Sequence, residues 1–139
     1  MKTLLGILAL ALVVIGVGIQ FIRPPIIGHD SPVVSEPQWP DPQVLDLARR
    51  ACFDCHSNET VWYWYTQIAP ISWLVANDVA EGRMTVNFSD WGRVAERGEL
   101  GEAVLEGEMP PGTYLMIHPS ARLSNADRQS LAAGLSALR

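Results

Sequence analysis

The stretch "RRACFDCHSN", residues 49–58, contains both cysteines of the chain, three residues apart, with His56 directly after the second. This spacing is compatible with a disulfide, a metal site, a redox dithiol or a covalently attached haem. A disulfide framework would require several cysteine pairs. A thioredoxin-like dithiol would begin a helix after a strand, whereas this pair follows a predicted helix with no strand pattern nearby.

Zinc and haem are the alternatives that remain. A structural zinc ion needs four ligands, and the consecutive Cys55 and His56 are poorly placed for one tetrahedron, with His118 required as the fourth. Covalent haem fits the order of the residues directly. Thiols at Cys52 and Cys55 can bond to the two vinyl groups of a porphyrin, and the imidazole of His56 can bind the iron. The motif therefore favours one covalent haem c over zinc and over a chance occurrence.

The second axial position of the iron requires a methionine or a histidine. Met109 lies in "EGEMPPGTY", between a helix-ending Gly107 and two prolines that stiffen the following loop. His118 is the alternative distal ligand, because imidazole also binds haem iron well. Met84 and Met116 lack such a setting. We therefore predict His56 as the proximal ligand and Met109 as the distal ligand, with His118 as the alternative.

The N-terminus carries 20 uncharged residues, 3–22, between Lys2 and Arg23. A helix with a rise of about 1.5 Å per residue would make this run roughly 30 Å long, enough to cross the hydrocarbon core of a bilayer. A cleaved signal sequence is the alternative, but its apolar part is usually about 7–15 residues long. We predict a retained transmembrane anchor over residues 1–23.

The remaining chain divides by composition into a linker and a domain. Residues 24–42 contain six of the ten prolines and predict an extended linker, in which His29 and Trp39 have no site role. Residues 43–139 form the predicted haem-binding domain. The net charge is −5 and Lys2 is the only lysine, so the composition argues against a nucleic-acid partner.

The domain shows helical spacing and no useful alternating strand pattern, which predicts an all-α fold of three to five short helices. Asp41 and Pro42 begin the first helix, which ends at the cysteines. A second helix is predicted to end at Gly82. Two short helices follow in residues 88–107, the first capped by Ser89 and the second ended by Gly107. The last helix has Ser124 as its N-cap and a leucine stripe at Leu131, Leu135 and Leu138.

Aromatic and acidic residues gather in two further segments. A porphyrin offers large apolar faces, so we expect haem packing by Trp62, Trp64, Trp73 and Tyr114, with ordinary core packing as the alternative. Arg83 and Arg93 could reach haem propionates, but a solvated surface position is favoured. The acidic series predicts a solvated helix face, with docking to a basic partner as the alternative; it comprises Glu96, Glu99, Glu102, Glu106 and Glu108.

The domain resembles a family of small membrane-anchored bacterial haem-binding domains of the cytochrome c type, over residues 44–138. The resemblance is carried by "CFDCHSNETVWYWY", "APISWLVANDV", "GR", "NFSDW", "MPPGTY" and "HPSARLS". It implies a small cytochrome c-like helical domain around one covalent haem, with thioethers at Cys52 and Cys55 and His56 on the iron. It also implies maturation outside the bacterial cytoplasmic membrane, so that the single-pass anchor keeps Lys2 inside and the domain in the periplasm.

Two classes of function follow. An electron carrier between respiratory partner proteins needs a six-coordinate iron and no catalytic residue, and none of the side chains forms a convincing acid, base or nucleophile cluster. We therefore predict a periplasmic monohaem c-type cytochrome that is not an enzyme. A haem sensor or small peroxidase-like enzyme is the alternative, and it would need a labile sixth position with His118 as distal acid or base. A structural haem in an assembly subunit is a third possibility.

Overall fold

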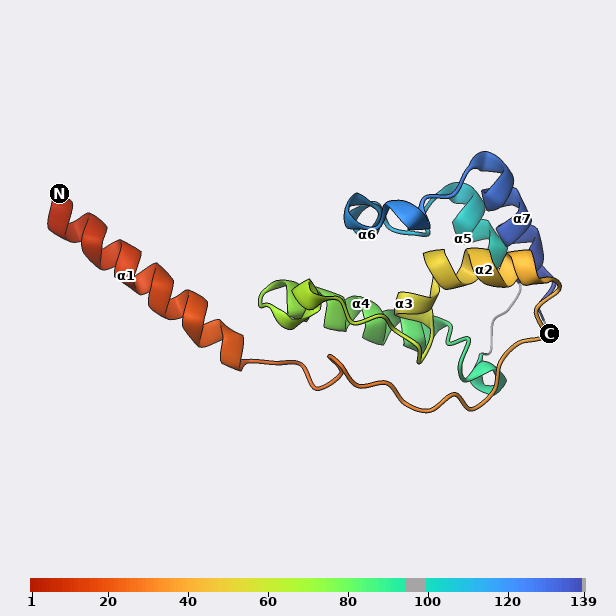
Figure 1. Cartoon of the computed structure of the whole chain (residues 1–139), viewed down its shortest axis with the longest axis horizontal. Coiled ribbons are helices and arrows are strands. Elements are labelled where there is room, and N and C mark those ends of the chain that lie inside the picture. Colours follow the sequence, from red (N-terminus) through yellow and green to blue (C-terminus); the bar gives the residue numbers. More distant parts are fainter. Residues whose placement is uncertain (95–99, 139) are drawn as a thin grey trace. The chain divides into compact units, whose positions relative to one another are not determined.

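The computed structural model describes residues 1–94 and 100–138, and within these residues the fold is all-α (Figure 1). The α-helices are α1 (Lys2–Gly18), α2 (Pro42–Ala51), α3 (Phe53–His56), α4 (Ile71–Thr85), α5 (Leu100–Glu106), α6 (Gly112–Ile117) and α7 (Asn125–Ser136). Short 3-10 turns are η1 (Ile19–Phe21), η2 (Trp64–Gln67), η3 (Trp91–Arg93) and η4 (Pro119–Ala121). The described residues contain no strand, only an isolated bridge between Ser35 and Asp90, so the predicted fold class is confirmed.

The chain forms two compact units that do not follow the order of the sequence. The first comprises residues 1–29 and 62–78, and the second comprises residues 30–61 and 79–139. The first unit therefore joins the N-terminal helix to the aromatic segment. The second contains the cysteine motif, Met109 and His118.

The N-terminal helix continues from α1 into η1, and together they cover Lys2–Phe21. This 20-residue helix is long and apolar enough to cross a membrane, a test that a signal sequence also passes. The side chains of Leu4, Leu8 and Leu12 are all exposed. An apolar helix with exposed leucines on successive turns is typical of a membrane-spanning segment.

Helix α2 begins as the sequence predicts. Asp41 is its N-cap and accepts a hydrogen bond from the Val44 amide at 3.0 Å, with Pro42 in the first turn. The predicted apolar face is buried and comprises Val44, Leu47, Ala48 and Ala51. Cys52 is the C-cap of this helix, and the short α3 then carries the rest of the motif.

The predicted N-cap of helix α7, Ser124, is also confirmed. Ser124 accepts from the Asp127 amide, and the Asp127 carboxylate accepts from the Ser124 amide, which makes a capping box. Leu131, Leu135 and Leu138 are all buried.

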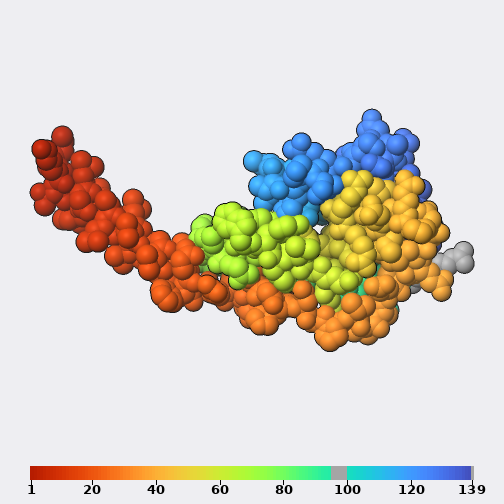
Figure 2. Space-filling model, viewed as in Figure 1, coloured from red at the N-terminus to blue at the C-terminus, as the bar shows by residue number. Residues whose placement is uncertain are grey.

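The core of the second unit lies where α2, α5 and α7 meet. Helix α7 packs against both α2 and α5, and the space-filling view shows α2 and α7 in close contact (Figure 2). Side chains from the segment after α4 complete this core. The cluster comprises Val44, Leu47, Ala48, Phe53, Val86, Phe88, Trp91, Val94, Val104, Leu131, Ala132, Leu135 and Leu138, with Cys52 packed at its margin.

Three local predictions are wrong. Helix α4 continues through Gly82 to Thr85, so Gly82 is an interior residue. The turn after it is capped by Asp90, because the Ser89 hydroxyl accepts from the Asn58 amide instead. The described part of the predicted domain also contains six α-helices, α2 to α7, in place of the three to five predicted, since the four-residue α3 and the six-residue α6 are separate elements.

Residues 30–41 lack helix, as predicted for the linker, but they pack on the second unit. The Ser89 carbonyl accepts from the amides of Val34 and Ser35, and the Trp91 amide donates to the Ser35 carbonyl. The ring of Trp39 lies 5.3 Å from that of Phe88. This half of the proline-rich segment therefore belongs to the folded body.

Candidate haem site

The cysteine motif occupies one tight turn. The Cys52 carbonyl accepts from the amides of both Cys55 and His56, at 3.1 and 2.9 Å. Both cysteines are thiols and partly buried. Cys52 is the N-cap of the short helix α3, and Cys55 and His56 are its last two residues, so the turn brings the two thiols and the imidazole into one short segment.

His56 is held on both sides by the segment after α4. Its Nδ1 donates to the Val86 carbonyl at 3.1 Å, and its own carbonyl accepts from the Phe88 amide at 2.8 Å. Because a carbonyl only accepts, the proton is on Nδ1 and the lone pair is on Nε2. Burial lowers the pKa of His56 against the opposing effect of hydrogen bonds to Val86 and Gly82, so the ring is neutral at neutral pH. This is the form that binds a metal.

A network of polar side chains also holds residues 86–89, the segment after α4. Asn87 donates from Nδ2 to Asn58 Oδ1 at 2.9 Å, and its own side-chain oxygen accepts from the Ser89 amide. Asn58 in turn donates to the Pro32 carbonyl at 3.0 Å. Through these contacts Asn58, Asn87 and Ser89 position the segment that holds His56.

Arg83 is part of this network, and the predicted solvated position is wrong for it. Its side chain is only 13% exposed and forms an ion pair with Asp30. Its guanidinium also donates to the Ser57 carbonyl at 2.8 Å and to Thr60 Oγ1 at 2.9 Å. Arg93, by contrast, is 85% exposed, as predicted.

Gly82 explains why α4 passes so close to the motif. A Cβ at this position would lie 2.5 Å from the backbone oxygen of Cys55, a distance that real Cβ atoms do not adopt. Glycine here allows the helix backbone to contact the cysteine turn directly. The sequence pattern predicted a helix end at Gly82, whereas its role here is close packing against the cysteine turn.

The environment of the thiols disfavours two alternatives. Burial, and to a smaller extent Cys55, raises the pKa of Cys52 to about 12. A redox dithiol needs a lowered thiol pKa. Among the described residues, no three His, Cys, Asp or Glu side chains gather as a metal site, so a zinc ion shared with His118 lacks support.

Tyr114 connects the motif to the segment after Met109. Its hydroxyl donates to Asp54 Oδ2 at 2.7 Å, and Asp54 is one of the two residues between the cysteines. The ring of Tyr114 stacks on His118 with 3.8 Å between centroids. His118 is buried, and its Nδ1 donates to the Tyr114 carbonyl at 2.9 Å. Asp54 was not among the predicted site residues.

Met109 follows the predicted helix end. Gly107 has a φ of 80° and terminates α5, and the Met109 amide then donates to the Ala103 carbonyl at 3.1 Å. The Met109 side chain is 37% exposed, whereas those of Met84 and Met116 are 84% and 77% exposed. Of the four methionines, which include Met1, Met109 is thus the most enclosed. Its role as a ligand remains a prediction.

The predicted aromatic contacts divide between the two units. Tyr114 belongs to the unit that carries the motif, whereas Trp62, Trp64 and Trp73 belong to the other. Haem packing by these tryptophans therefore stays a prediction. Of the acidic series, Glu102, Glu106 and Glu108 are exposed, and Glu96 and Glu99 lie outside the described residues.

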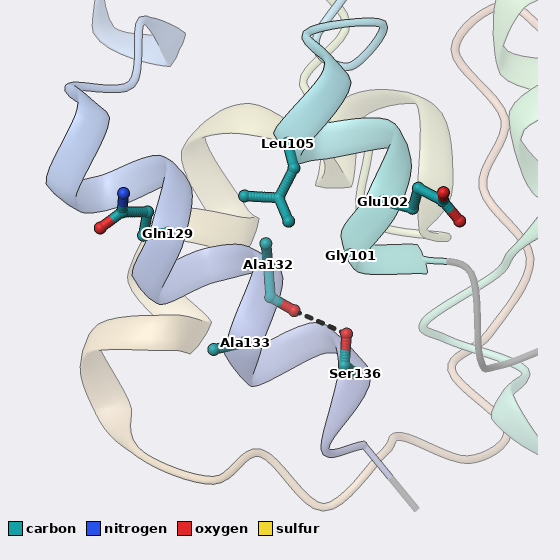
Figure 3. Close-up of a pocket in the computed structure, with 7 residues that line it drawn as sticks. All are labelled: Gly101, Glu102, Leu105, Gln129, Ala132, Ala133 and Ser136. Atoms are coloured by element: carbon teal, nitrogen blue, oxygen red, sulfur yellow. Dashed lines mark hydrogen bonds between the residues drawn. The ribbon is translucent and has the colours of Figure 1, made fainter.

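A surface groove between α5 and α7 contains none of the predicted site residues (Figure 3). Its tight floor arises because a Cβ on Gly101 would lie 2.5 Å from the Ala132 carbonyl, and Ser136 donates to that same oxygen at 2.9 Å. The lining residues are Gly101, Glu102, Leu105, Gln129, Ala132, Ala133 and Ser136. This groove reflects the close packing of α5 and α7.

The sequence of the chain matches the family model described as a haem-binding domain over residues 14–137. The chain belongs to this haem-binding domain family. No curated protein and no solved structure matches it significantly. The match includes residues 14–29 and 62–78, so the haem-binding domain of the family model covers residues of both compact units.

The residues of this haem-binding domain fit the group that the family binds. His56 presents a neutral imidazole with its proton held on Nδ1, as iron ligands require. Cys52 lies against apolar side chains, where a neutral thioether is better accommodated than a thiolate. The donor set of the cysteine turn is therefore consistent with a haem bound there.

Proposed function

We propose that this chain is a membrane-anchored, periplasmic monohaem c-type cytochrome that carries single electrons between respiratory partner proteins. The haem would be covalent, on Cys52 and Cys55, with His56 as the proximal ligand. When bound, the haem iron supplies one-electron chemistry. The chain's own residues bind, orient and shield it.

The observation that carries the proposal is the hydrogen bond from His56 Nδ1 to the Val86 carbonyl. It fixes the ring orientation and the tautomer before any iron is bound. The bond leaves the lone pair of Nε2 available to an iron ion. The family match and the C-x-x-C-H spacing support the same assignment.

Covalent attachment needs no redox partner within the domain. Each thiol would add across one vinyl double bond, its sulfur to one carbon and its proton to the other, which would leave the oxidation level unchanged overall. Burial of Cys52 keeps its thiol protonated and its product in an apolar environment. Two thioethers would then hold the cofactor even when the iron changes charge.

The proposed location rests on the apolar helix Lys2–Phe21 and on the site of haem attachment in proteins that this chain resembles. With Lys2 on the cytoplasmic side, the motif lies in the periplasm. Electron transfer there requires partner proteins that dock near the haem. Exposed Glu102, Glu106 and Glu108 would favour a basic partner.

A haem sensor or peroxidase-like enzyme is the second candidate, and one observation favours it. His118 shows the same pattern as His56, with Nδ1 donating to a backbone carbonyl, and it is buried. It could therefore be a distal ligand or a distal acid and base if Met109 is not on the iron. The electron carrier should resist carbon monoxide and cyanide, whereas the enzyme should bind them readily.

One experiment tests the assignment. The full chain, expressed with the periplasmic maturation machinery, is purified in detergent and its denatured mass is measured beside its oxidised and reduced absorption spectra. A mass increase of one haem and a reduced spectrum typical of two thioethers are expected. Haem that separates on denaturation would contradict covalent attachment, and ready binding of carbon monoxide would contradict the carrier.

A further inference from the structure

The aromatic segment of residues 62–74 is hydrogen-bonded to the end of the N-terminal helix. Gln20 donates from Nε2 to the Ala69 carbonyl at 3.1 Å, and the Ala69 amide donates back to Gln20 Oε1 at 3.0 Å. The indole Nε1 of Trp73 donates to the Ile22 carbonyl at 2.7 Å. All of these residues belong to the first compact unit.

These contacts fix the segment at a particular depth. If Lys2–Phe21 spans the bilayer, its length of roughly 30 Å matches the hydrocarbon core. Gln20 and Ile22 then lie at the surface where the helix leaves the membrane. Ala69 and Trp73 are one hydrogen bond away from them, so they lie at the same surface.

The side chains of the segment are those that a membrane interface favours. Residues 60–77 contain no charged side chain, and Trp62, Trp64 and Trp73 lie among two tyrosines. Trp and Tyr concentrate at the level of lipid headgroups, where their rings are apolar and their polar atoms reach water. The large exposed side chains are Tyr63 at 37%, Trp64 at 76%, Ile68 at 41%, Ile71 at 45% and Leu74 at 65%.

Several backbone polar groups of the segment are already hydrogen-bonded within it, which suits a low-dielectric surface. In η2, the amides of Thr66 and Ile68 donate to the carbonyls of Tyr63 and Tyr65. The Thr66 hydroxyl is also satisfied, since it donates to the Tyr63 carbonyl at 2.7 Å. Pairing within the segment lowers the free-energy cost of placing it among headgroups and acyl chains.

We propose that residues 62–74 form an interfacial membrane-binding segment that inserts Trp64, Ile71 and Leu74 into the outer leaflet beside the anchor. The partner of this segment is the lipid bilayer that the anchor itself crosses. The inference rests on the proposed anchor. It gives Trp64 and Trp73 a lipid environment in place of the haem packing predicted for them.

The test uses spin labels on single introduced cysteines in the full chain, because two thioethers would leave no native thiol to label. Trp64→Cys and Leu74→Cys report on the segment. Leu12→Cys is the control inside the anchor, and Glu106→Cys is the control on a charged surface. Each protein is reconstituted in vesicles of phosphatidylethanolamine and phosphatidylglycerol, and its haem spectrum confirms that it is folded.

Collision rates with oxygen and with a water-soluble nickel chelate distinguish the environments. Labels at Trp64 and Leu74 should show an oxygen-to-nickel ratio several-fold above that at Glu106 and below that at Leu12. A ratio equal to that at Glu106 would place the segment in water and overturn the proposal. Low access to both reagents would mean burial in protein, against haem or a partner, and would also overturn it.

The failures of the two proposals are separable. A Leu12 label in water would remove the anchor on which the inference rests, and would overturn both the location and the inserted segment. Labelling of the unmodified chain would instead show missing thioethers and contradict the haem assignment alone. The same four positions would then be read in a Cys52→Ser, Cys55→Ser background, so the answer on the segment does not depend on haem attachment.

Discussion

The imidazole of His56 is oriented by backbone atoms, and this makes the site unusually dependent on where the segment 86–88 lies. The Val86 carbonyl and the Phe88 amide both bind His56, and neither can be altered by a side-chain substitution. Residues that position this segment, such as Asn87 and Gly82, therefore become the means of testing the site. Their effects should appear in haem spectra before they appear in overall folding.

Gly82→Ala is the sharpest such test. Alanine is favoured over glycine by about 1 kcal/mol in a helix interior. The added Cβ, however, would lie 2.5 Å from the Cys55 backbone oxygen, and such overpacking costs about 1–3 kcal/mol. We expect the steric effect to dominate, with incomplete attachment at Cys55 seen as chains with one thioether by mass spectrometry of haem peptides.

Gly112→Ala is the matched control, since a Cβ there meets nothing within 4 Å. It should leave haem attachment and thermal stability unchanged or slightly improved. Equal behaviour of the two variants would show that the contact between α4 and the cysteine turn has no role in attachment.

Met109 and His118 can be separated by their spectra. If Met109 is on the iron, the oxidised protein should show the weak sulfur-to-iron charge-transfer band, and Met109→Ala should abolish it, lower the midpoint potential and open the iron to small ligands. His118→Ala should leave the band intact. The reverse pattern, with Met109→Ala silent and His118→Ala opening the iron, would establish bis-histidine ligation and contradict the proposed distal ligand.

At the scale of elements, the ends marked by capping residues were predictable and the ends set by tertiary contacts were not. Asp41, Ser124 and Gly107 act within their own turns, and all three predictions are confirmed. Gly82 has its role through contact with Cys55, far away in the sequence, so local rules misassigned it. Helix α6 was missed because six residues after two prolines carry little periodicity.

The Tyr114 hydroxyl joins α6 to α3 through one hydrogen bond, to Asp54. Tyr114→Phe removes the hydrogen bond to Asp54, at an expected cost of about 1–2 kcal/mol, while it keeps the stack on His118. Because α6 begins three residues after Met109, a looser α6 should weaken the charge-transfer band and raise the rate of cyanide binding. Tyr63→Phe, in the other unit, is the control. An unchanged band and rate would mean that this bond only stabilises the fold.

The capping box at the N-terminus of α7 should make the free energy of unfolding depend on pH. Hydrogen bonds from the Ser124 side chain and backbone, with smaller contributions from Arg50, lower the pKa of Asp127 below its ordinary 3.8. A carboxyl group whose pKa is lower in the folded state stabilises that state at pH values above its pKa in the unfolded chain. This contribution disappears as the pH falls through its pKa in the folded state. Asp127→Asn should therefore flatten the loss of stability measured by urea unfolding between neutral pH and about pH 3.

Asp46→Asn provides the comparison for that measurement. It removes one negative charge from α2, where the carboxylate lies 4.0 Å from Arg50 and is 81% exposed, without disturbing a cap. Its acid profile should match that of the unmodified protein. If both variants flattened the profile equally, net charge rather than the capping box would be the cause.

At the scale of the molecule, the sequence predicted the individual segments better than it predicted which segments belong to the same compact unit. The long apolar N-terminal helix, the cysteine motif and the all-α fold follow from apolar length, spacing and helical periodicity. The grouping of residues 62–78 with residues 1–29 does not, because it depends on Gln20 and Trp73, single polar groups that bind backbone atoms of another segment. Such contacts leave no periodic pattern in the sequence.

The second unit also predicts how the protein behaves without its cofactor. Its buried cluster joins α2, α5 and α7 with residues 86–94, and Cys52 lies only at the margin. These helices therefore pack mainly on one another, and the haem should add stability to a body that already has a core. In the Cys52→Ala, Cys55→Ala double variant, we expect most of the helical circular dichroism to remain while the melting temperature falls by more than about 5 °C.

The same variant should lose order first where contacts with the cluster are fewest. Helix α6 exposes Met116 at 77% and Ile117 at 58%, and it is tied to the motif by Tyr114, so its amides should exchange with deuterium faster. Amides of Leu131 and Leu135, in the buried face of α7, should stay protected. Loss of protection throughout α7 would show that the haem is the centre of the core, and that the cluster around α2 and α7 cannot persist alone.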